Sequence, residues 1–148
     1  CGMMLVDTGA RLRVDPHVLE TARLLASGQN PAAIDPRLGF AKNTPQPVVD
    51  AITSLTSETD PKVTYKDWIS DDTFDCISRL KAIKTTSIAI CGSEDYFTPV
   101  KYSEYFRDNL PSCSLQVIEE AGHWTYHEQP QVFDRIALDY LDNLDAQK

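Results

Sequence analysis

Three short apolar runs, each bounded by turn-forming residues, constrain the fold of this chain more than any other feature. They cover residues 3–6, 87–91 and 115–118 of the 148-residue sequence. Short runs with few polar positions are typical of parallel strands that are covered on both faces. We therefore expect about three parallel strands in an α/β arrangement.

The residues between the second and third runs have the pattern of a helix. Thr98 can cap it, and Pro99 suits its first position. Tyr102, Phe106 and Leu110 then follow at intervals of four residues. The two runs and this helix together span about 32 residues, the size of a βαβ unit.

The clearest helix signal covers residues 131–144. Its apolar residues fall on one stripe and its charged residues on the opposite face, which is typical of a helix that packs across a sheet. The stripe consists of Phe133, Ile136, Ala137, Tyr140, Leu141 and Leu144. Helices flanking the strands are thus part of the predicted α/β fold.

The stretch from residue 14 to residue 70 contains no convincing strand and is predicted to be helical. Within it, capping residues directly precede prolines, a combination found at helix starts. These pairs are Asp15-Pro16, Asn30-Pro31, Thr44-Pro45 and Asp60-Pro61, with Gly28 and Gly39 as plausible helix ends. We therefore divide the chain into a core of residues 1–13 and 71–148 and a helical insertion of residues 14–70.

Charge and composition exclude several classes of partner. The net charge of −8 argues against nucleic acid and against anionic membrane surfaces, both of which attract clustered Lys and Arg. No window approaches the ~18 consecutive apolar residues of a membrane span. The 4 cysteines include no C-x-x-C pair, which fits reduced thiols. We expect a cytoplasmic protein without a membrane or nucleic-acid partner.

Two polar loops each follow a predicted strand directly. Residues 92–99 contain Asp95, and residues 119–124 contain His123. Because ligand chemistry gathers at the carboxyl ends of parallel strands, both side chains belong to one rim of the sheet. A carboxylate bound to one imidazole nitrogen fixes the histidine tautomer and stabilises the imidazolium. The order acid, then histidine, after successive strands predicts that Asp95 and His123 are a catalytic pair.

The residues around these loops resemble the C-terminal half of the α/β-hydrolase superfamily, over essentially the whole chain. The shared residues are Leu80-Lys81-Ala82-Ile83, Gly92-Ser93-Glu94-Asp95, Pro99, Ala121-Gly122-His123, Glu128 and Pro130. Residues 4–14 also resemble the strand that follows the nucleophile helix in that superfamily. The resemblance implies a partial α/β-hydrolase fold, with residues 14–70 as a helical cap over the active site. It also implies that Asp95 and His123 are the acid and the histidine of a catalytic triad.

The nucleophile of such a triad is not found in this sequence. The G-x-S-x-G motif that carries it occurs nowhere in the 148 residues. The resemblance places that motif before Met3, together with the oxyanion loop and roughly the first five strands of the fold. Cys1 lacks the strand–turn–helix setting of a nucleophile. We expect a C-terminal fragment of a longer hydrolase, inactive alone, whose upstream nucleophile can be Ser, Asp or Cys.

Several other side chains allow further interpretations. Phe97 and Trp124 lie beside the catalytic loops and are predicted to line an apolar substrate pocket. Glu94, next to Asp95, is an alternative triad acid. Arg11 and Arg13 are candidates for steering a substrate carboxylate.

Glu128 and its neighbours admit a structural role and a metal-binding one. His123, His127 and Glu128 form H-x-x-x-H-E, which faintly resembles a zinc motif. Gly122 and Pro130 bracket this stretch as a loop and no third ligand follows, so no metal or cofactor is predicted. We expect Glu128 to cap the following helix or to tie down the histidine loop.

The resemblance implies a hydrolase that acts on a small, largely apolar ester, lactone or related carbonyl substrate. Esterases, lactonases, carbon–carbon bond hydrolases, dehalogenases and peroxidase-like members share this half of the fold, so the substrate stays open. An alternative is a non-catalytic binding or assembly module. In that case the first strand, residues 3–6, pairs through its exposed edge with a second copy or with a separate N-terminal half.

Overall fold

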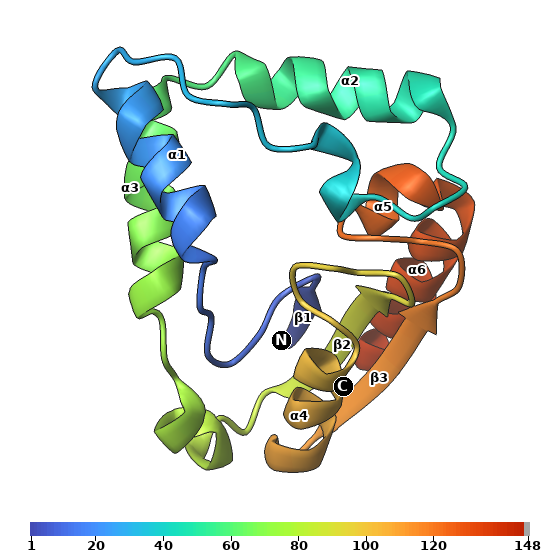
Figure 1. Cartoon of the computed structure of the whole chain (residues 1–148). Coiled ribbons are helices and arrows are strands. Elements are labelled where there is room, and N and C mark those ends of the chain that lie inside the picture. The colour runs from blue at the N-terminus through green and yellow to red at the C-terminus, as the bar shows by residue number, and fades with distance from the viewer. Residues whose placement is uncertain (147–148) are drawn as a thin grey trace.

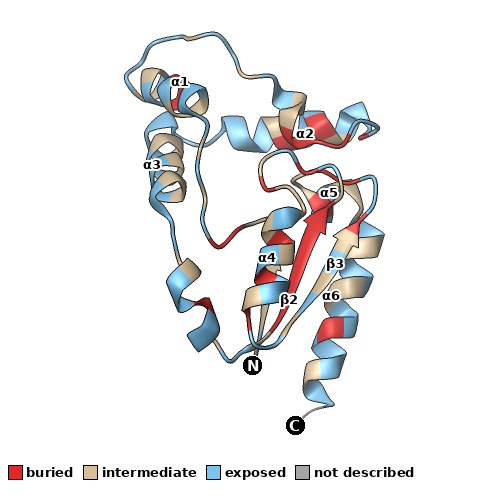
Figure 2. Cartoon of the chain, turned by 60° about the horizontal axis from the view of Figure 1, so that its bottom comes forward, coloured by how far each residue is buried: buried red, intermediate tan, exposed pale blue. Residues whose placement is uncertain are grey.

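A computed structural model describes residues 1–146, and its centre is a parallel sheet in the order β1-β2-β3. The strands are β1 (Gly2–Val6), β2 (Thr86–Gly92) and β3 (Cys113–Ile118) (Figure 1). All three predicted runs are strands, extended by one or two residues. The central strand β2 is buried along almost its whole length (Figure 2). The predicted α/β fold is confirmed.

Helices cover both faces of the sheet. On one face, Ala89 of β2 packs with Phe106 of α4 (Lys101–Asn109). On the other face, Ile88 and Ile90 pack with Tyr140 of α6 (Pro130–Asp145). Successive residues of a strand point to opposite faces, so β2 supplies both cores.

The helix predicted over residues 131–144 is confirmed as α6, with one residue of its stripe misplaced. Leu141 is 46% exposed. It follows the buried Tyr140 by one residue, which turns its side chain about 100° around the helix and away from the sheet. The Tyr140 hydroxyl donates to the carbonyl of Thr86 at 2.6 Å and accepts from the amide of Met3 at 2.9 Å, so it joins β1 and β2 at their starts.

Between β1 and β2 the described chain is helical. It forms α1 (Pro16–Ala26), η1 (Pro36–Gly39), α2 (Gln46–Ser57), α3 (Pro61–Thr73) and η2 (Ile77–Ala82). α1 packs along α3, and α2 lies beyond the carboxyl ends of the strands, next to α5 (Thr125–Glu128) (Figure 1). The segment predicted as an insertion thus lies on the side of the sheet to which Asp95 and His123 belong.

Two of the four predicted helix starts have the predicted cap. Asp15 accepts from the amide of His17 at 2.7 Å, and Asp60 accepts from that of Lys62 at 2.8 Å. The start predicted at Asn30-Pro31 is wrong, because residues 29–35 are irregular. The next turn is instead the short helix η1, which Asp35 caps.

Two threonines that were predicted as helix caps bind carboxylates instead. α2 begins at Gln46 without a side-chain cap, and the hydroxyl of Thr44 donates to Glu128. α4 begins at Lys101, later than predicted, and the hydroxyl of Thr98 donates to Asp95 at 2.8 Å. Both threonine hydroxyls donate to a carboxylate in a charge-assisted hydrogen bond, and within residues 1–146 neither caps a helix.

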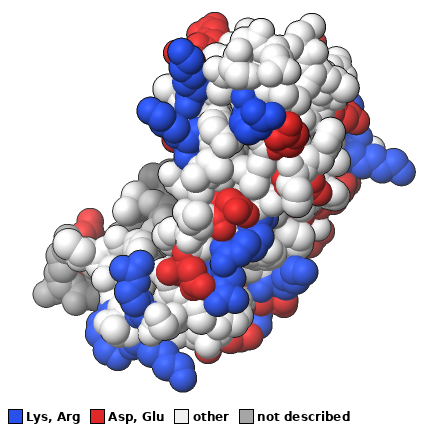
Figure 3. Space-filling model, turned by 60° about the vertical axis from the view of Figure 1, so that its left-hand side comes forward, with Lys and Arg blue, Asp and Glu red and all other residues white. Residues whose placement is uncertain are grey.

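Charges of both signs are mixed on one face of the molecule (Figure 3). On the face shown in Figure 3, basic and acidic side chains lie next to one another, without the broad basic area that follows a nucleic-acid backbone. Within residues 1–146, no helix has the length and apolar character needed to cross a membrane.

Candidate active site

Asp95 lies in the turn that follows β2, and three donors hold its carboxylate. Oδ1 accepts from the amides of Phe97 at 2.8 Å and Thr98 at 2.9 Å. Oδ2 accepts from the hydroxyl of Thr98 at 2.8 Å. The side chain is 0% exposed. These contacts fix Asp95 in one orientation, with Oδ2 toward the next loop.

His123 lies in the turn that follows β3, directly against this carboxylate. Its Nδ1 is 2.9 Å from Oδ2 of Asp95. The His123 side chain is 26% exposed, whereas that of Asp95 is fully buried. Within residues 1–146, Nε2 of His123 has no hydrogen-bond partner. One ring nitrogen is therefore held by a buried acid while the other is left for a reacting group.

The two groups shift each other's titration in opposite directions. Burial raises the pKa of Asp95. The hydrogen bond and charge of His123, together with the hydrogen bonds of Thr98, lower this pKa by more than burial raises it, so it lies below its ordinary value. Burial lowers the pKa of His123, but the hydrogen bond and charge of Asp95 and the charges of Asp7 and Glu128 together outweigh burial, so the pKa lies above its ordinary value. The pair therefore favours an ionised acid beside a basic imidazole.

Glu128 ties the histidine loop to the chain that leads into α2. Its Oε1 accepts from the amides of Gly122 at 2.9 Å and Trp124 at 3.2 Å, on either side of His123. Its Oε2 accepts from the amide of Ala41 at 2.8 Å and from the hydroxyl of Thr44. Glu128 was predicted either to cap the following helix or to tie down the histidine loop. The structure has the second role, because no side chain caps α6.

Gly122 is required by the close approach of two backbone segments. The amide of His123 donates to the carbonyl of Gly39 at 2.7 Å. A Cβ at Gly122 would collide with that same carbonyl and with the amide of Ala41. Only glycine lets the histidine loop lie this close to residues 39–41.

Two aromatic rings pack edge to face with the imidazole of His123. The ring centroid of Phe97 lies 5.2 Å from that of His123, and the centroid of Trp124 lies 5.5 Å from it. Trp124 also stacks on Phe40, with centroids 4.4 Å apart. Both aromatic residues predicted as pocket residues therefore lie against the imidazole.

A cavity of about 390 Å³ lies between the helices of the insertion and Phe97. Its wall consists of apolar side chains such as Leu25, Ile34 and Trp68, with the hydroxyl groups of several Thr and Ser residues. No charged side chain lines it. Phe97 thus separates this neutral cavity from His123, whereas Trp124 is packed beside Phe40 and does not line it.

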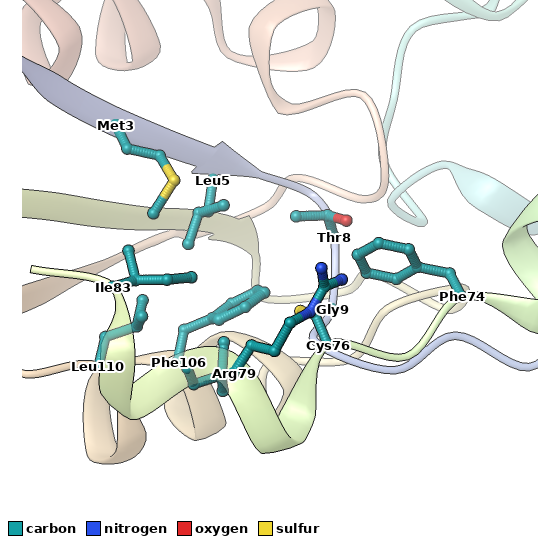
Figure 4. A pocket seen from close by; sticks show the side chains of 11 residues that line it. Met3, Leu5, Thr8, Gly9, Phe74, Cys76, Arg79, Ile83, Phe106 and Leu110 are labelled. Atoms are coloured by element: carbon teal, nitrogen blue, oxygen red, sulfur yellow. The ribbon is translucent and has the colours of Figure 1, made fainter. Parts of the chain in front are cut away.

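A second apolar cavity, of about 380 Å³, lies under β1 and is separate from the histidine. Met3 and Leu5 of β1 point into it, toward Phe106 and Leu110 (Figure 4). Neither Asp95 nor His123 lines it.

The alternative site residues are engaged elsewhere. Glu94 accepts from the amide of Lys42 at 2.8 Å, so its carboxylate holds the insertion rather than the imidazole. The guanidinium of Arg11 binds Asp75 at 2.7 Å, and that of Arg13 donates to a backbone carbonyl. Among residues 1–146, no group of three or more His, Cys, Asp or Glu is arranged to hold a metal ion.

Asp7 is a site residue that the sequence reasoning missed. Its sequence setting, directly after the first apolar run, is that of an ordinary turn residue, yet it is 9% exposed and has φ +46°. Its Oδ2 accepts from the hydroxyl of Thr125 at 2.8 Å, two residues after His123. Burial raises the pKa of Asp7 to about 7. Its place after a strand, at the same rim as Asp95, was the signal that could have identified it.

Comparisons with known proteins give partial relatives and close structural neighbours. No model of a protein family matches the chain. A 2-hydroxy-6-oxo-6-phenylhexa-2,4-dienoate hydrolase from Burkholderia cepacia is 33% identical over 70 residues, which are 47% of this chain and 24% of that protein. A proline iminopeptidase from Heyndrickxia coagulans is 32% identical over 71 residues, 48% of this chain and 24% of that protein.

Solved structures share the fold over nearly the whole chain. An esterase from Thermogutta terrifontis has a TM-score of 0.82 at 21% identity, over 96% of this chain and 56% of that one. A second structure, of a thermophilic esterase, has a TM-score of 0.76 at 27% identity, over 97% and 57%. The enol-lactonase of Burkholderia xenovorans LB400 has a TM-score of 0.80 at 18% identity, over 95% and 56%. The chain thus spans just over half of these structures, and its aligned part is about a quarter of the curated relatives.

Proposed function

We propose that this chain supplies two of the three groups of a hydrolase's catalytic triad. It belongs to the α/β-hydrolase superfamily and has the C-terminal half of its fold. Asp95 is the acid and His123 is the general base. The contact of 2.9 Å between Nδ1 of His123 and Oδ2 of Asp95, at the carboxyl ends of two neighbouring strands, carries this proposal. The nucleophile, which we take to be a serine, belongs to a part of the protein outside these 148 residues.

In this proposal His123 transfers one proton in each of two half-reactions, first the formation and then the hydrolysis of an acyl-enzyme. Nε2 accepts the proton of the serine hydroxyl as the oxygen attacks the carbonyl carbon of the substrate. The imidazolium that forms is stabilised by the ionised Asp95, and it then donates the same proton to the leaving oxygen. Water repeats the sequence on the acyl-enzyme: His123 takes its proton, the acid product leaves, and the serine regains its hydrogen.

The substrate we propose is a small, largely apolar ester, lactone or related carbonyl compound. The neutral cavity of about 390 Å³ beside Phe97 supports this choice, because its size is in the range of small-ligand sites. A charged substrate would find no side chain of opposite charge on that wall. Relatives and structural neighbours that are esterases, an enol-lactonase and an oxo-dienoate hydrolase also favour a carbonyl substrate.

Placing a charge on the wall of this cavity is expected to weaken the use of an apolar ester. Leu25 lines the cavity and is 42% exposed, so Leu25→Asp should fold and still present a carboxylate to the acyl chain. We expect kcat/KM of the longer hydrolase for p-nitrophenyl butyrate to fall about tenfold. Leu55→Asp is the matched control, because Leu55 is also exposed but does not line the cavity. Equal values for the two variants would remove the cavity from the substrate site.

A second candidate function, assembly through the sheet edge, is favoured by the position of β1. In the part of the chain that the structure describes, β1 pairs only with β2. The amide of Asp7 donates to Ile90 at 2.9 Å, and amides alternate in direction along a strand. The amides of Met4 and Val6 therefore point to the free edge, where a strand of a second copy or of a separate N-terminal half can pair.

Removing one edge donor tests this pairing without affecting β2. Met4→Pro deletes an amide that faces the free edge, and proline is tolerated in edge strands. We expect the chain to sediment as a concentration-dependent dimer and the variant as a monomer of nearly unchanged stability. A chain that stays monomeric at high concentration would exclude self-association through β1.

A further inference from the structure

The burial of Asp7 is not explained by the acid–histidine pair alone. The residue directly follows β1 at the rim where Asp95 and His123 lie, and it is 9% exposed. Its φ of +46° lies in the left-handed region, which is unfavourable for most residues other than glycine. Its Oδ1 is buried without a hydrogen-bond partner among residues 1–146. A carboxyl group is costly to bury in this way.

The other oxygen of Asp7 holds the start of the helix that follows His123. Oδ2 accepts from the hydroxyl of Thr125 at 2.8 Å and from its amide at 3.2 Å. Thr125 is fully buried and begins α5, which also carries Glu128. Since Glu128 binds the amides on either side of His123, a shift of Asp7 would move the whole histidine loop.

Asp7 also acts on His123 through its charge, which raises the pKa of the imidazole. Four carboxylates act on His123 from the elements packed around it: Asp95 after β2, Asp7 after β1, Glu128 in α5 and Asp71 in α3. Burial lowers the pKa of His123, and Asp95, Asp7 and Glu128 raise it, in decreasing order of effect. The charge of Asp7 reaches Cys91 and Tyr126 as well, the other titratable groups near it.

We propose that Asp7 is a positioning residue for His123: it anchors the histidine loop through Thr125 and presents a second negative charge to the imidazolium. This inference rests on the proposed function, in which His123 is the general base. A residue with a purely structural role would hold the loop but leave the protonation of His123 unchanged. The titration of His123 therefore separates the two roles.

The test is an NMR titration of the ring signals of His17, His123 and His127 in this chain. Asp7→Asn keeps an acceptor for Thr125, and asparagine tolerates the left-handed backbone. We expect the midpoint of His123 to move to lower pH and those of His17 and His127 to stay. Asp75→Asn is the matched control, since that carboxylate binds Arg11 and should leave all three midpoints unchanged.

An unchanged His123 midpoint in a folded Asp7→Asn protein would overturn the charge effect. If that variant does not fold, the shape of the His123 titration curve in the unmodified chain tests the charge effect instead. Because burial raises the pKa of Asp7 to about 7 and the charge of Asp7 acts on His123, we expect the ionisation of Asp7 to make the His123 curve broader than a single ionisation. A curve with a Hill coefficient of about one would contradict the coupling.

Two further variants complete the test. Thr125→Val removes the hydroxyl that donates to Asp7. We expect this variant to increase the rate of amide hydrogen exchange at residues 122–125 more than it does in β2. If the exchange rates of the loop and of β2 changed equally, the anchoring role of Asp7 would be contradicted. Asp95→Asn should lower the His123 midpoint more than Asp7→Asn does. If Asp95→Asn has no effect, the proposed function fails, whereas a failure of Asp7→Asn alone overturns only this inference.

Discussion

Replacing Asp95 by asparagine in the longer hydrolase is expected to lower kcat by about three to four orders of magnitude. The amide keeps an acceptor for the amides of Phe97 and Thr98, but it can no longer hold the productive tautomer of His123 or stabilise the imidazolium. His123→Ala, which removes the base itself, should lower kcat by a similar factor. Initial rates with p-nitrophenyl acetate at saturating concentration measure both.

The control for this prediction is the neighbouring acid. Glu94 binds the amide of Lys42 and has no hydrogen bond with His123 within residues 1–146. Glu94→Gln should therefore keep kcat within a few-fold of the unmodified enzyme. If Glu94→Gln lost as much activity as Asp95→Asn, the assignment of the triad acid would have to change.

Asp7 should make the stability of the chain fall as pH rises. Burial raises its pKa from 3.8 to about 7, so the folded state keeps a proton that the unfolded state loses. A group with a raised folded pKa contributes stability that is fully present below the unfolded value and lost as pH rises through the folded one. For a shift of this size the loss is roughly 4 kcal/mol at and above pH 8.

Asp7→Asn should remove this loss. Relative to the unmodified chain, we expect the free energy of unfolding of the variant to gain about 3 kcal/mol between pH 5 and pH 8, measured by urea denaturation. Asp75→Asn should show a nearly constant difference over this range, because the lowered pKa of Asp75 keeps it ionised throughout. A constant difference for Asp7→Asn as well would mean that Asp7 ionises without penalty.

The two expected results for Asp7 would together describe a residue that lowers stability at neutral pH and adds a charge beside His123. Sites built for chemistry often contain such groups, because the arrangement that shifts a catalytic pKa is rarely the most stable one. For the longer hydrolase the same variant should shift the acid limb of the kcat/KM profile toward lower pH.

Much of the fold was predictable because its signals are local. The strand at 87–91 is a short, largely apolar run bounded by turn-forming residues, as is typical of a strand in a sheet covered on both faces, and residues 92–99 follow it as a polar turn. Since parallel strands bring their carboxyl ends together, Asp95 and His123 could be placed at one rim without coordinates.

What escaped prediction depends on partners far away in the sequence. Thr44 has the local pattern of a helix cap, but α2 begins without a side-chain cap and the Thr44 hydroxyl donates to a carboxylate 84 residues later. Asp7 looks like an ordinary turn residue, and its burial and its bond to Thr125 arise only when β1 and the histidine loop meet. Such contacts have no periodicity that a sequence pattern can detect.

The most direct measurement of the central claim, that Asp95 and His123 activate a nucleophile outside these 148 residues, is labelling by a fluorophosphonate probe read as intact mass. The longer hydrolase should gain one adduct, on a serine upstream of residue 1, and His123→Ala and Asp95→Asn should slow its formation by about three orders of magnitude. This chain alone should gain none. Labelling of the His123→Ala protein at the unmodified rate, or an adduct on this chain alone, would contradict the account.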